Sequence, residues 1–388
     1  MSGRKPAAFV VGAFEHLQRR ISDKTVPEVL GEVVLGALED AGLGPGDVDG
    51  YFCSSDVPGM GVLSMAEYLG LDNLRYGDCT EGGGASYLSH VGHACAAIAA
   101  GKCSVAVISM AGIPSSGARH SFQPAPEDPY ESWLARPPVA LYALAAQRHM
   151  HEFGTTSEQL AAIKVAASRH AQHNPHAKLR QVVTVAEVLD SPLISDPLHR
   201  LDCCITSDGG GAVVLVSPEV ARTLPRRGAA VLGHGEAFKH TNNGRTDVTF
   251  TGAVWSAPRA YAEAGVGPAN IKYASIYDSF TITVLMLLED LGFCAKGEGG
   301  RFVGDGSAIG PGGALPVNSD GGGLCNNHPN SRRGMVRLIE AVRQVRGEAQ
   351  PAVQVPDCDL ALVQGIGKSV GSRSFSSCLL YTSDAADE

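Results

Sequence analysis

The stretch AGLGPGDV at residues 41–48 decides the fold, because it returns as AGVGPANI at residues 264–271. Each copy follows a segment with the apolar spacing of a helix and precedes a short apolar, β-prone stretch. A triple glycine follows each copy, at 82–84 and at 321–323, and opens another helix-like segment. Because the same order of parts occurs twice, we predict two similar halves with a pseudo-twofold relation and a site where the two glycine turns meet.

The first half shows the alternation of helices and strands most clearly. Thr25 and Pro27 suit the start of a helix, and Gly42 suits its end. Residues 85–100 are rich in small side chains, which predicts a buried helix, and Cys103–Met110 is mostly apolar, which predicts a strand covered on both faces. Strands alternating with helices predict a layered α/β fold.

Prolines and loops interrupt this alternation between residues 113 and 200, which we interpret as an insertion in the first half that covers the site. We place the first half at residues 1–223, including the insertion, and the second at 224–375. Residues 376–388 show no clear pattern and are expected to be a non-native or disordered tail.

Composition excludes several classes of function. The formal charge of −9 without a long basic run argues against nucleic acid as the main partner. Apolar stretches are strand-sized or interrupted by polar residues, so we expect no membrane span, and the N-terminus lacks the pattern of a secretory signal. Ten cysteines without framework spacing favour a reducing compartment, so we expect a cytoplasmic protein without a metal site.

The segment NSDGGGLCNNHP at residues 318–329 carries the clearest chemistry. A glycine-rich turn lets the backbone approach a ligand closely. His328 precedes a proline, which disfavours a helix and holds the histidine in an extended turn. The alternative is an ordinary loop histidine that is satisfied by hydrogen bonds.

This segment resembles the Asn-x-x-Gly-Gly…Gly-His-Pro motif of the thiolase superfamily, although Asn327, not glycine, precedes His328. The resemblance extends from about Ala7 to Arg373 and includes IYDSF at 276–280, DCCITSDGGGA at 202–212 and GIG at 365–367. Together these motifs are similar to the branch of the sterol-carrier-protein-x thiolases and lipid-transfer-protein aldolases. The resemblance implies a five-layered α/β/α/β/α core of two duplicated halves, with the insertion in the first.

Two departures from the family pattern bear on the reaction. The position of the nucleophilic cysteine, at the start of the buried helix, falls on Gly84, and that of the second cysteine falls near Gln364. Glycine has no nucleophile and glutamine no acid/base group, so this alignment excludes a covalent acyl-enzyme at the usual place. Cys79 lies too far upstream to replace the nucleophile. Cys325, in the segment at residues 318–329 (the histidine loop), is the better candidate for a substitute nucleophile.

The remaining groups suit proton transfer. His328 can act as a base or a hydrogen-bond donor, and Tyr277 occupies the place of a residue that polarises the thioester carbonyl in thiolases. Asp278 is expected to orient the backbone or Tyr277. The alternative for Tyr277 is a structural tyrosine at the end of a strand, with its hydroxyl hydrogen-bonded within the protein. We expect the substrate and oxyanion to be bound by backbone and amide groups of Gly84, Ala85, Asn318, Gly322, Gly323 and Gly365.

The resemblance implies cleavage or formation of a carbon–carbon bond beside a bulky acyl-CoA thioester, of retro-aldol type and without a bound cofactor. The alternatives are acyl transfer of the acetyl-CoA acetyltransferase type and a non-catalytic subunit that binds acyl-CoA or lipid. The resemblance also implies a small OB-fold and zinc-ribbon partner and a homodimer, for which we take Cys103–Met110 to be the edge strand that pairs across the dimer axis.

Overall fold

The computed structural model describes residues 6–117, 138–240, 245–329, 333–370 and 373–383. Its strands in the first half are β1 (Phe9–Glu15), β2 (Gly50–Cys53), β3 (Tyr76–Cys79), β4 (Val105–Gly112) and β7 (Gly209–Val216). Those of the second half are β8 (Ala229–Lys239), β9 (Tyr273–Ser275), β10 (Leu360–Lys368) and β11 (Ser374–Ser383).

The two halves have the same strand order. The first runs β3-β2-β4-β7-β1 and the second runs β9-β10-β11-β8, and the outermost strand of the second is reduced to a parallel bridge between Ala274 and Val317. In both halves the first strand is antiparallel to the last, and the second strand is parallel to the fourth. A short pairing of β1 with β8 joins the two halves edge to edge. The predicted duplication is confirmed.

The repeated stretch has the same backbone conformation in both copies. Helix α1 (Val26–Ala41) ends at Gly42 with φ 70° and ψ 29°, and α9 (Ala253–Ala264) ends at Gly265 with φ 68° and ψ 31°. Both are left-handed caps, which glycine adopts without the steric cost that a Cβ brings. A single 3₁₀ turn follows each cap and leads into the second strand of its half.

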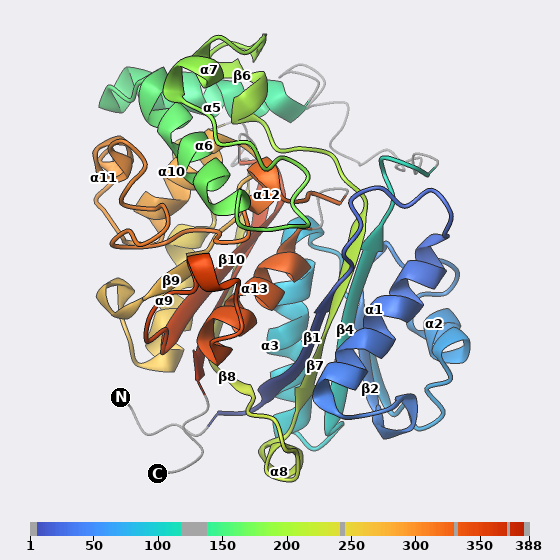
Figure 1. Cartoon of the computed structure of the whole chain (residues 1–388). Helices are drawn as coiled ribbons and strands as arrows, with labels where there is room; N and C mark the ends of the chain where they lie inside the picture. The colour runs from blue at the N-terminus through green and yellow to red at the C-terminus, as the bar shows by residue number, and fades with distance from the viewer. Residues whose placement is uncertain (1–5, 118–137, 241–244, 330–332, 371–372, 384–388) are drawn as a thin grey trace.

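The elements stack in five layers, as the resemblance implies (Figure 1). Helices α1 and α2 (Val62–Leu69) cover the outer face of the first sheet. The central layer consists of α3 (Ser86–Ala99) and α13 (Gly334–Arg346), which contact both sheets. Helices α9 and α10 (Thr281–Asp290) form the outer layer of the second half. Three separate apolar clusters fill the spaces between these layers, one on each side of the central helices and one around them.

The insertion lies over the second half (Figure 1). Its described elements are α5 (Pro138–Phe153), α6 (Ser157–Ala171), α7 (Val185–Leu189) and the short strands β5 (Leu193–Ser195) and β6 (Leu198–His199). Helix α6 contacts α10, α11 (Gly299–Val303) and α12 (Gly322–Cys325). A further short helix, α8 (Pro218–Ala221), precedes the start of the second half at β8. Residues 118–137 of the predicted insertion lie outside the described residues.

Three expectations need correction. Strand β4 is interior, between β2 and β7, so it is not the edge strand; the open edge of the first half is β3. The glycines at 321–323 open only the four-residue α12, and the buried helix α13 begins later, at Gly334. Residues 376–383 are not disordered, because they belong to β11, which pairs with β8 and β10 along its length and buries most of its side chains.

Candidate active site

The turn that begins α3 packs backbone against backbone on β10. A Cβ built on Gly365 would lie 2.8 Å from the carbonyl oxygen of Gly84, and one built on Gly367 would collide with that of Gly82. Only glycine permits such an approach at these positions. The predicted site residue Gly365 therefore serves close packing, and its Cα faces Gly84 and not a ligand space.

Tyr277 fills the space beside Gly84 that a side chain would need. A Cβ built on Gly84 would lie 2.5 Å from the carbonyl oxygen of Ile366 and closer still to the Oη and Cε2 atoms of Tyr277. The tyrosine follows β9, and its backbone N–H donates to Oε1 of Gln364 at 3.3 Å. The phenol hydroxyl thus stands where the thiolase pattern places a nucleophilic side chain.

His328 lies beside Tyr277. The two ring centroids are 6.0 Å apart, and the rings meet edge to face at 82°. The backbone N–H of His328 donates to Oγ of Ser207 at 2.9 Å, which anchors the histidine loop to the segment before β7. Within the described residues, Nε2 of His328 is buried and has no hydrogen-bond partner. Such an orphaned nitrogen is available to a ligand.

The surroundings move the two pKa values apart. Burial lowers the pKa of His328 to about 4; Arg333 and Arg337 contribute to the lowering, and Asp278 opposes it. Burial raises the pKa of Tyr277 well above its ordinary value, and Arg337 opposes that rise. At neutral pH the imidazole is therefore uncharged and the phenol keeps its proton.

Asp278 is fully engaged within the protein. Its Oδ2 accepts the N–H of Gly323 at 2.7 Å, and its Oδ1 accepts from Arg337. The residue is 1% exposed. These contacts tie the strand end that carries Tyr277 to the loop that carries His328, so the structure places Asp278 as a clamp between them rather than at the reacting centre.

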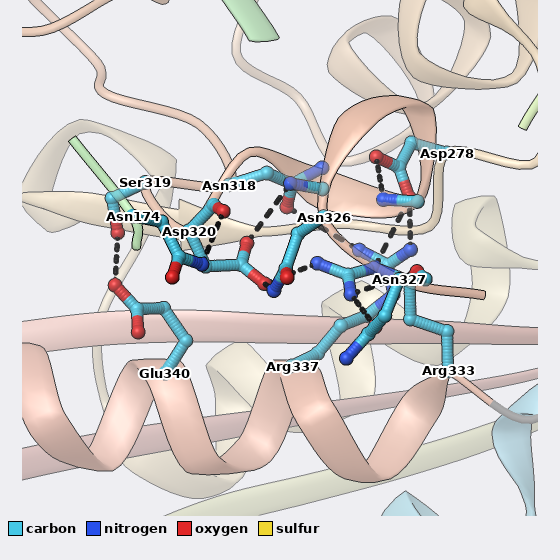
Figure 2. A network of polar contacts seen from close by, with 12 residues as sticks. Asn174, Asp278, Asn318, Ser319, Asp320, Asn326, Asn327, Arg333, Arg337 and Glu340 are labelled. Carbon is cyan, nitrogen blue, oxygen red and sulfur yellow. Dashed lines mark hydrogen bonds and ion pairs between the residues drawn. The ribbon is translucent and has the colours of Figure 1, made fainter. Parts of the chain in front are cut away.

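A buried polar network supports this clamp (Figure 2). Arg333, just before the start of α13, and Arg337 and Glu340 on that helix project towards the loop at 318–327. Arg333 pairs with Asp320 and donates to Asn327, next to His328. Glu340 accepts from Ser319 at 2.5 Å. The two arginines are balanced by the carboxylates of Asp278 and Asp320, which is how proteins tolerate buried charge.

Several groups that we expected to bind an oxyanion are already bonded. The N–H groups of Ala85 and Gly322 donate to Gly82 and Asp320, and that of Gly323 donates to Asp278. The side-chain amide of Asn318 bonds both the N–H and the carbonyl of Ile276 at 2.9 Å. In this structure these backbone and amide groups therefore shape the loop around Tyr277 and His328.

The candidate substitute nucleophiles do not join the pair. Cys325 is buried, its Sγ accepts from Nζ of Lys164 at 3.2 Å, and burial raises its pKa. Cys79 is exposed at the end of β3. Gln364 donates to the Gly365 carbonyl and to Ser376, so its amide is a structural bridge. Burial therefore disfavours a thiolate nucleophile at Cys325.

Two cavities among the described residues are lined by neither Tyr277 nor His328. One of about 290 Å³ lies along α3 and β8 and is lined by residues such as Cys95, Val231 and His234. Another, of about 10 Å³, borders Asp278 and Asn318 and holds no more than a water molecule. Tyr277 and His328 are 3% and 7% exposed. Both side chains of the pair are therefore buried in this structure.

Sequence reasoning missed the arginines. Arg333 and Arg337 are 1% and 0% exposed, whereas charged residues on a helix normally face solvent. The available signal was the run MVRLIEAV at 335–342, in which charged residues interrupt an apolar segment. Lys164, in the insertion, was also missed; its Nζ donates to the carbonyl of Leu324 at 2.6 Å and ties α6 to the histidine loop.

A family model and two proteins of similar sequence relate the chain to known proteins. The family model of the thiolase C-terminal domain-like proteins matches residues 235–379. A steroid side-chain-cleaving aldolase of Thermomonospora curvata is 36% identical over 81% of this chain and 84% of its own. An acetyl-CoA acetyltransferase of Methanothermobacter thermautotrophicus is 32% identical over 94% of this chain and 97% of its own.

A solved structure agrees over the whole fold. The Ltp2-ChsH2(DUF35) aldolase superposes with a TM-score of 0.88, with 33% identity over 98% of this chain and 99% of the compared chain. The chain belongs to the thiolase superfamily, in the branch of the sterol-carrier-protein-2-thiolase-like proteins and steroid side-chain-cleaving aldolases.

Proposed function

We propose that this protein is a lyase that cleaves, or in reverse forms, the carbon–carbon bond next to an acyl-CoA thioester by retro-aldol chemistry without a covalent intermediate. One observation carries the proposal: the phenol of Tyr277 occupies the space beside Gly84 where a nucleophile would stand, with His328 at its edge. The similarity to a steroid side-chain-cleaving aldolase supports a bulky apolar acyl group.

The proposed reaction removes a proton from the hydroxyl on the β carbon and adds one to the α carbon. Nε2 of His328 accepts the proton of the β-hydroxyl, the bond between the α and β carbons breaks, and its electron pair passes into the thioester as an enolate. Tyr277 donates its proton to the enolate. The products are a carbonyl compound and a shortened acyl-CoA, and return of the proton from His328 to Tyr277 resets the site. No bound cofactor enters this sequence.

Acyl transfer is the alternative that the similarity to an acetyl-CoA acetyltransferase raises. It would need a nucleophile beside α3, and that place holds Gly84. The missing nucleophile at Gly84 also raises a second alternative, a subunit that binds acyl-CoA or lipid without converting it. A panel of β-hydroxyacyl-CoA and β-ketoacyl-CoA esters separates the three: lyase products from the former support the proposal, CoA-dependent products from the latter support acyl transfer, and binding without products supports the subunit.

We also propose a partner protein and a homodimer. The name of the similar aldolase combines two components, which supports an OB-fold and zinc-ribbon partner of the kind that the resemblance implies. The panel is therefore run with and without a candidate OB-fold and zinc-ribbon protein from the same organism. The strand at Cys103–Met110 cannot form the dimer contact, because it is interior. We propose instead that the dimer forms at the open edge of β3, near the exposed side chains of Met60, Leu63 and Tyr68 around α2. A stable monomer in light scattering at micromolar concentration would contradict the dimer.

All ten cysteines are unpaired, which supports the cytoplasm as the location. No helix among the described residues is long and apolar enough to cross a membrane.

A further inference from the structure

Arg337 lies directly over the ring of Tyr277. Its guanidinium carbon is 4.7 Å from the ring centroid, and the side chain is 0% exposed. Arg337 belongs to the central helix α13, whereas Tyr277 follows β9, so the contact is made by the fold and not by neighbouring residues in the sequence. A cation over an aromatic face is attracted to it, and the attraction is larger where water is excluded.

Three partners hold the guanidinium in this position. One terminal nitrogen donates to the carbonyl oxygen of Ile276 and lies 3.3 Å from Oδ1 of Asn318, and the other donates to Asp278. The Ile276 carbonyl precedes Tyr277 in the chain, so Arg337 contacts both the backbone and the ring of the same segment. An arginine that only neutralised Asp278 would not need the contact with the ring.

The positive charge of Arg337 stabilises Tyr277 most strongly after the phenol has lost its proton. A neutral phenol interacts with the cation only through its ring, but a phenolate carries a full negative charge that spreads into the ring below the guanidinium. Asp278, whose carboxylate pairs with the same guanidinium, partly cancels this effect. Burial works against ionisation of Tyr277, and Arg337 is the strongest group that works in its favour.

We propose that Arg337 is the positioning residue of the reaction, which holds the ring of Tyr277 beside Gly84 and stabilises the negative charge that the phenol carries after it has given up its proton. The inference rests on the proposed lyase function, and it assigns the group that makes Tyr277 a usable acid in a buried site. Arg333 does not share this role, because its contacts are with Asp320, Asp278 and Asn327.

The test measures the acidity of residue 277 directly. Tyr277 is replaced by a fluorinated tyrosine whose phenol ionises near neutral pH, and its ionisation is followed by fluorine NMR in the full chain. In the Arg337→Gln variant we expect the midpoint to rise by about one pH unit or more, which makes the phenol about tenfold weaker as an acid. In the Arg337→Lys variant, which keeps the charge, we expect less than half of that rise.

Two further variants control for loss of structure. Arg333→Gln removes an arginine that is as buried and as involved in ion pairs, and should move the midpoint by less than half as much as Arg337→Gln. Asp278→Asn should lower the midpoint, because it leaves the charge of Arg337 uncompensated, and it tests the proposal even if Arg337→Gln does not fold. Equal midpoints in wild type and Arg337→Gln, or a raised midpoint in Asp278→Asn, would overturn the proposal.

Kinetics separate this inference from the proposed function. With a β-hydroxyacyl-CoA that the wild type cleaves, Arg337→Gln should lower kcat about tenfold or more with little change in KM, since the charge is needed only as the proton moves. A raised KM with unchanged kcat would show a role in substrate binding and overturn the assignment. If the midpoints shift as expected but the wild type cleaves no substrate, the proposed function fails while the effect of Arg337 on Tyr277 stands.

Discussion

At the scale of single residues, the main feature of the proposed site is that Tyr277 fills the space beside Gly84 where the thiolase pattern has a nucleophile. Tyr277 and Gly84 are complementary, because the phenol needs the space that any side chain at position 84 would occupy. Motifs along the chain led us to predict Gly84, Tyr277 and His328 as site positions, and the structure brings these three residues together. Their contact could not be predicted, because it depends on how β9, α3 and the loop at 318–329 pack together, and Arg337 carries no motif at all.

The proton-transfer roles predict large losses on removal of either group. Tyr277→Phe and His328→Ala should each lower kcat/KM by roughly 10²–10⁴-fold, because each removes a proton donor or acceptor. Tyr261→Phe is the matched control: Tyr261 is also buried, and its hydroxyl donates to the Leu291 carbonyl far from the site. Full activity in both site variants, measured with an acyl-CoA that the wild type cleaves, would contradict these roles and favour the alternative of a binding protein.

Restoring a cysteine at position 84 should not create a thiolase. In the Gly84→Cys variant the new Cβ would overlap Tyr277 and the Ile366 carbonyl, and overpacking of this kind costs roughly 1–3 kcal/mol or more in stability. We expect lower thermal stability and loss of lyase turnover, with no CoA-dependent acyl transfer. Gly46→Ala is the control, since its Cβ would meet open space and should change neither. Thiolase activity in Gly84→Cys would contradict the account.

At the scale of elements, local signals were read more accurately than long-range pairing. Helix α1 begins one residue after Thr25, whose N–H bonds Glu28, and it ends at Gly42 as expected. The buried helix expected at 85–100 is found as α3. The strand predicted at 103–110 exists as β4, but its interior place in the sheet depends on β7, about a hundred residues away, and apolar content does not reveal strand order.

Helix α13 should be sensitive to loss of its buried ion pairs. Arg333→Met would leave Asp320 without its cation at 5% exposure, and breaking one partner of a buried pair typically costs about 3–5 kcal/mol. Arg301→Met is the control, because the Arg301–Glu298 pair is exposed and such pairs contribute about 0–1 kcal/mol. Urea unfolding measures both, and similar free energies of unfolding for the two variants would show that the network in Figure 2 does not stabilise the fold.

At the scale of the whole molecule, the duplication explains why a single site forms. Each half has the same strand order, and the two central helices α3 and α13 meet between the sheets, which brings Gly84 from one half to Tyr277 and His328 from the other. The repeat at 41–48 and 264–271 was enough to predict two halves. The fate of residues 376–383 was not predicted, because the last strand of a duplicated half is recognisable only by its place beside β8 and β10.

Stability of the whole chain should fall in mild acid. Burial lowers the pKa of His90, His170 and His328 to about 4, below the ordinary value near 6.5. The folded state therefore favours neutral histidine. The resulting contribution to the free energy of unfolding is fully present above pH 6.5 and is lost as the pH falls towards 4. The loss amounts to up to about 1.4 kcal/mol per pH unit for each histidine.

Urea unfolding between pH 7 and pH 4 measures this loss. His170→Gln should make the decline shallower, and His151→Gln, at an exposed position, should leave it unchanged. A free energy of unfolding that stays constant down to pH 4 would show that these histidines do not remain neutral in the folded protein.

Isotope incorporation tests whether carbon–carbon cleavage occurs without an acyl-enzyme. A β-hydroxyacyl-CoA substrate is turned over in D₂O, and the CoA products are analysed by mass spectrometry. The account predicts a shortened acyl-CoA with one deuterium at its α carbon and no requirement for added CoA, since protonation of the enolate is the last chemical step. Products that appear only when free CoA is added, together with an acyl adduct on the protein, would contradict it.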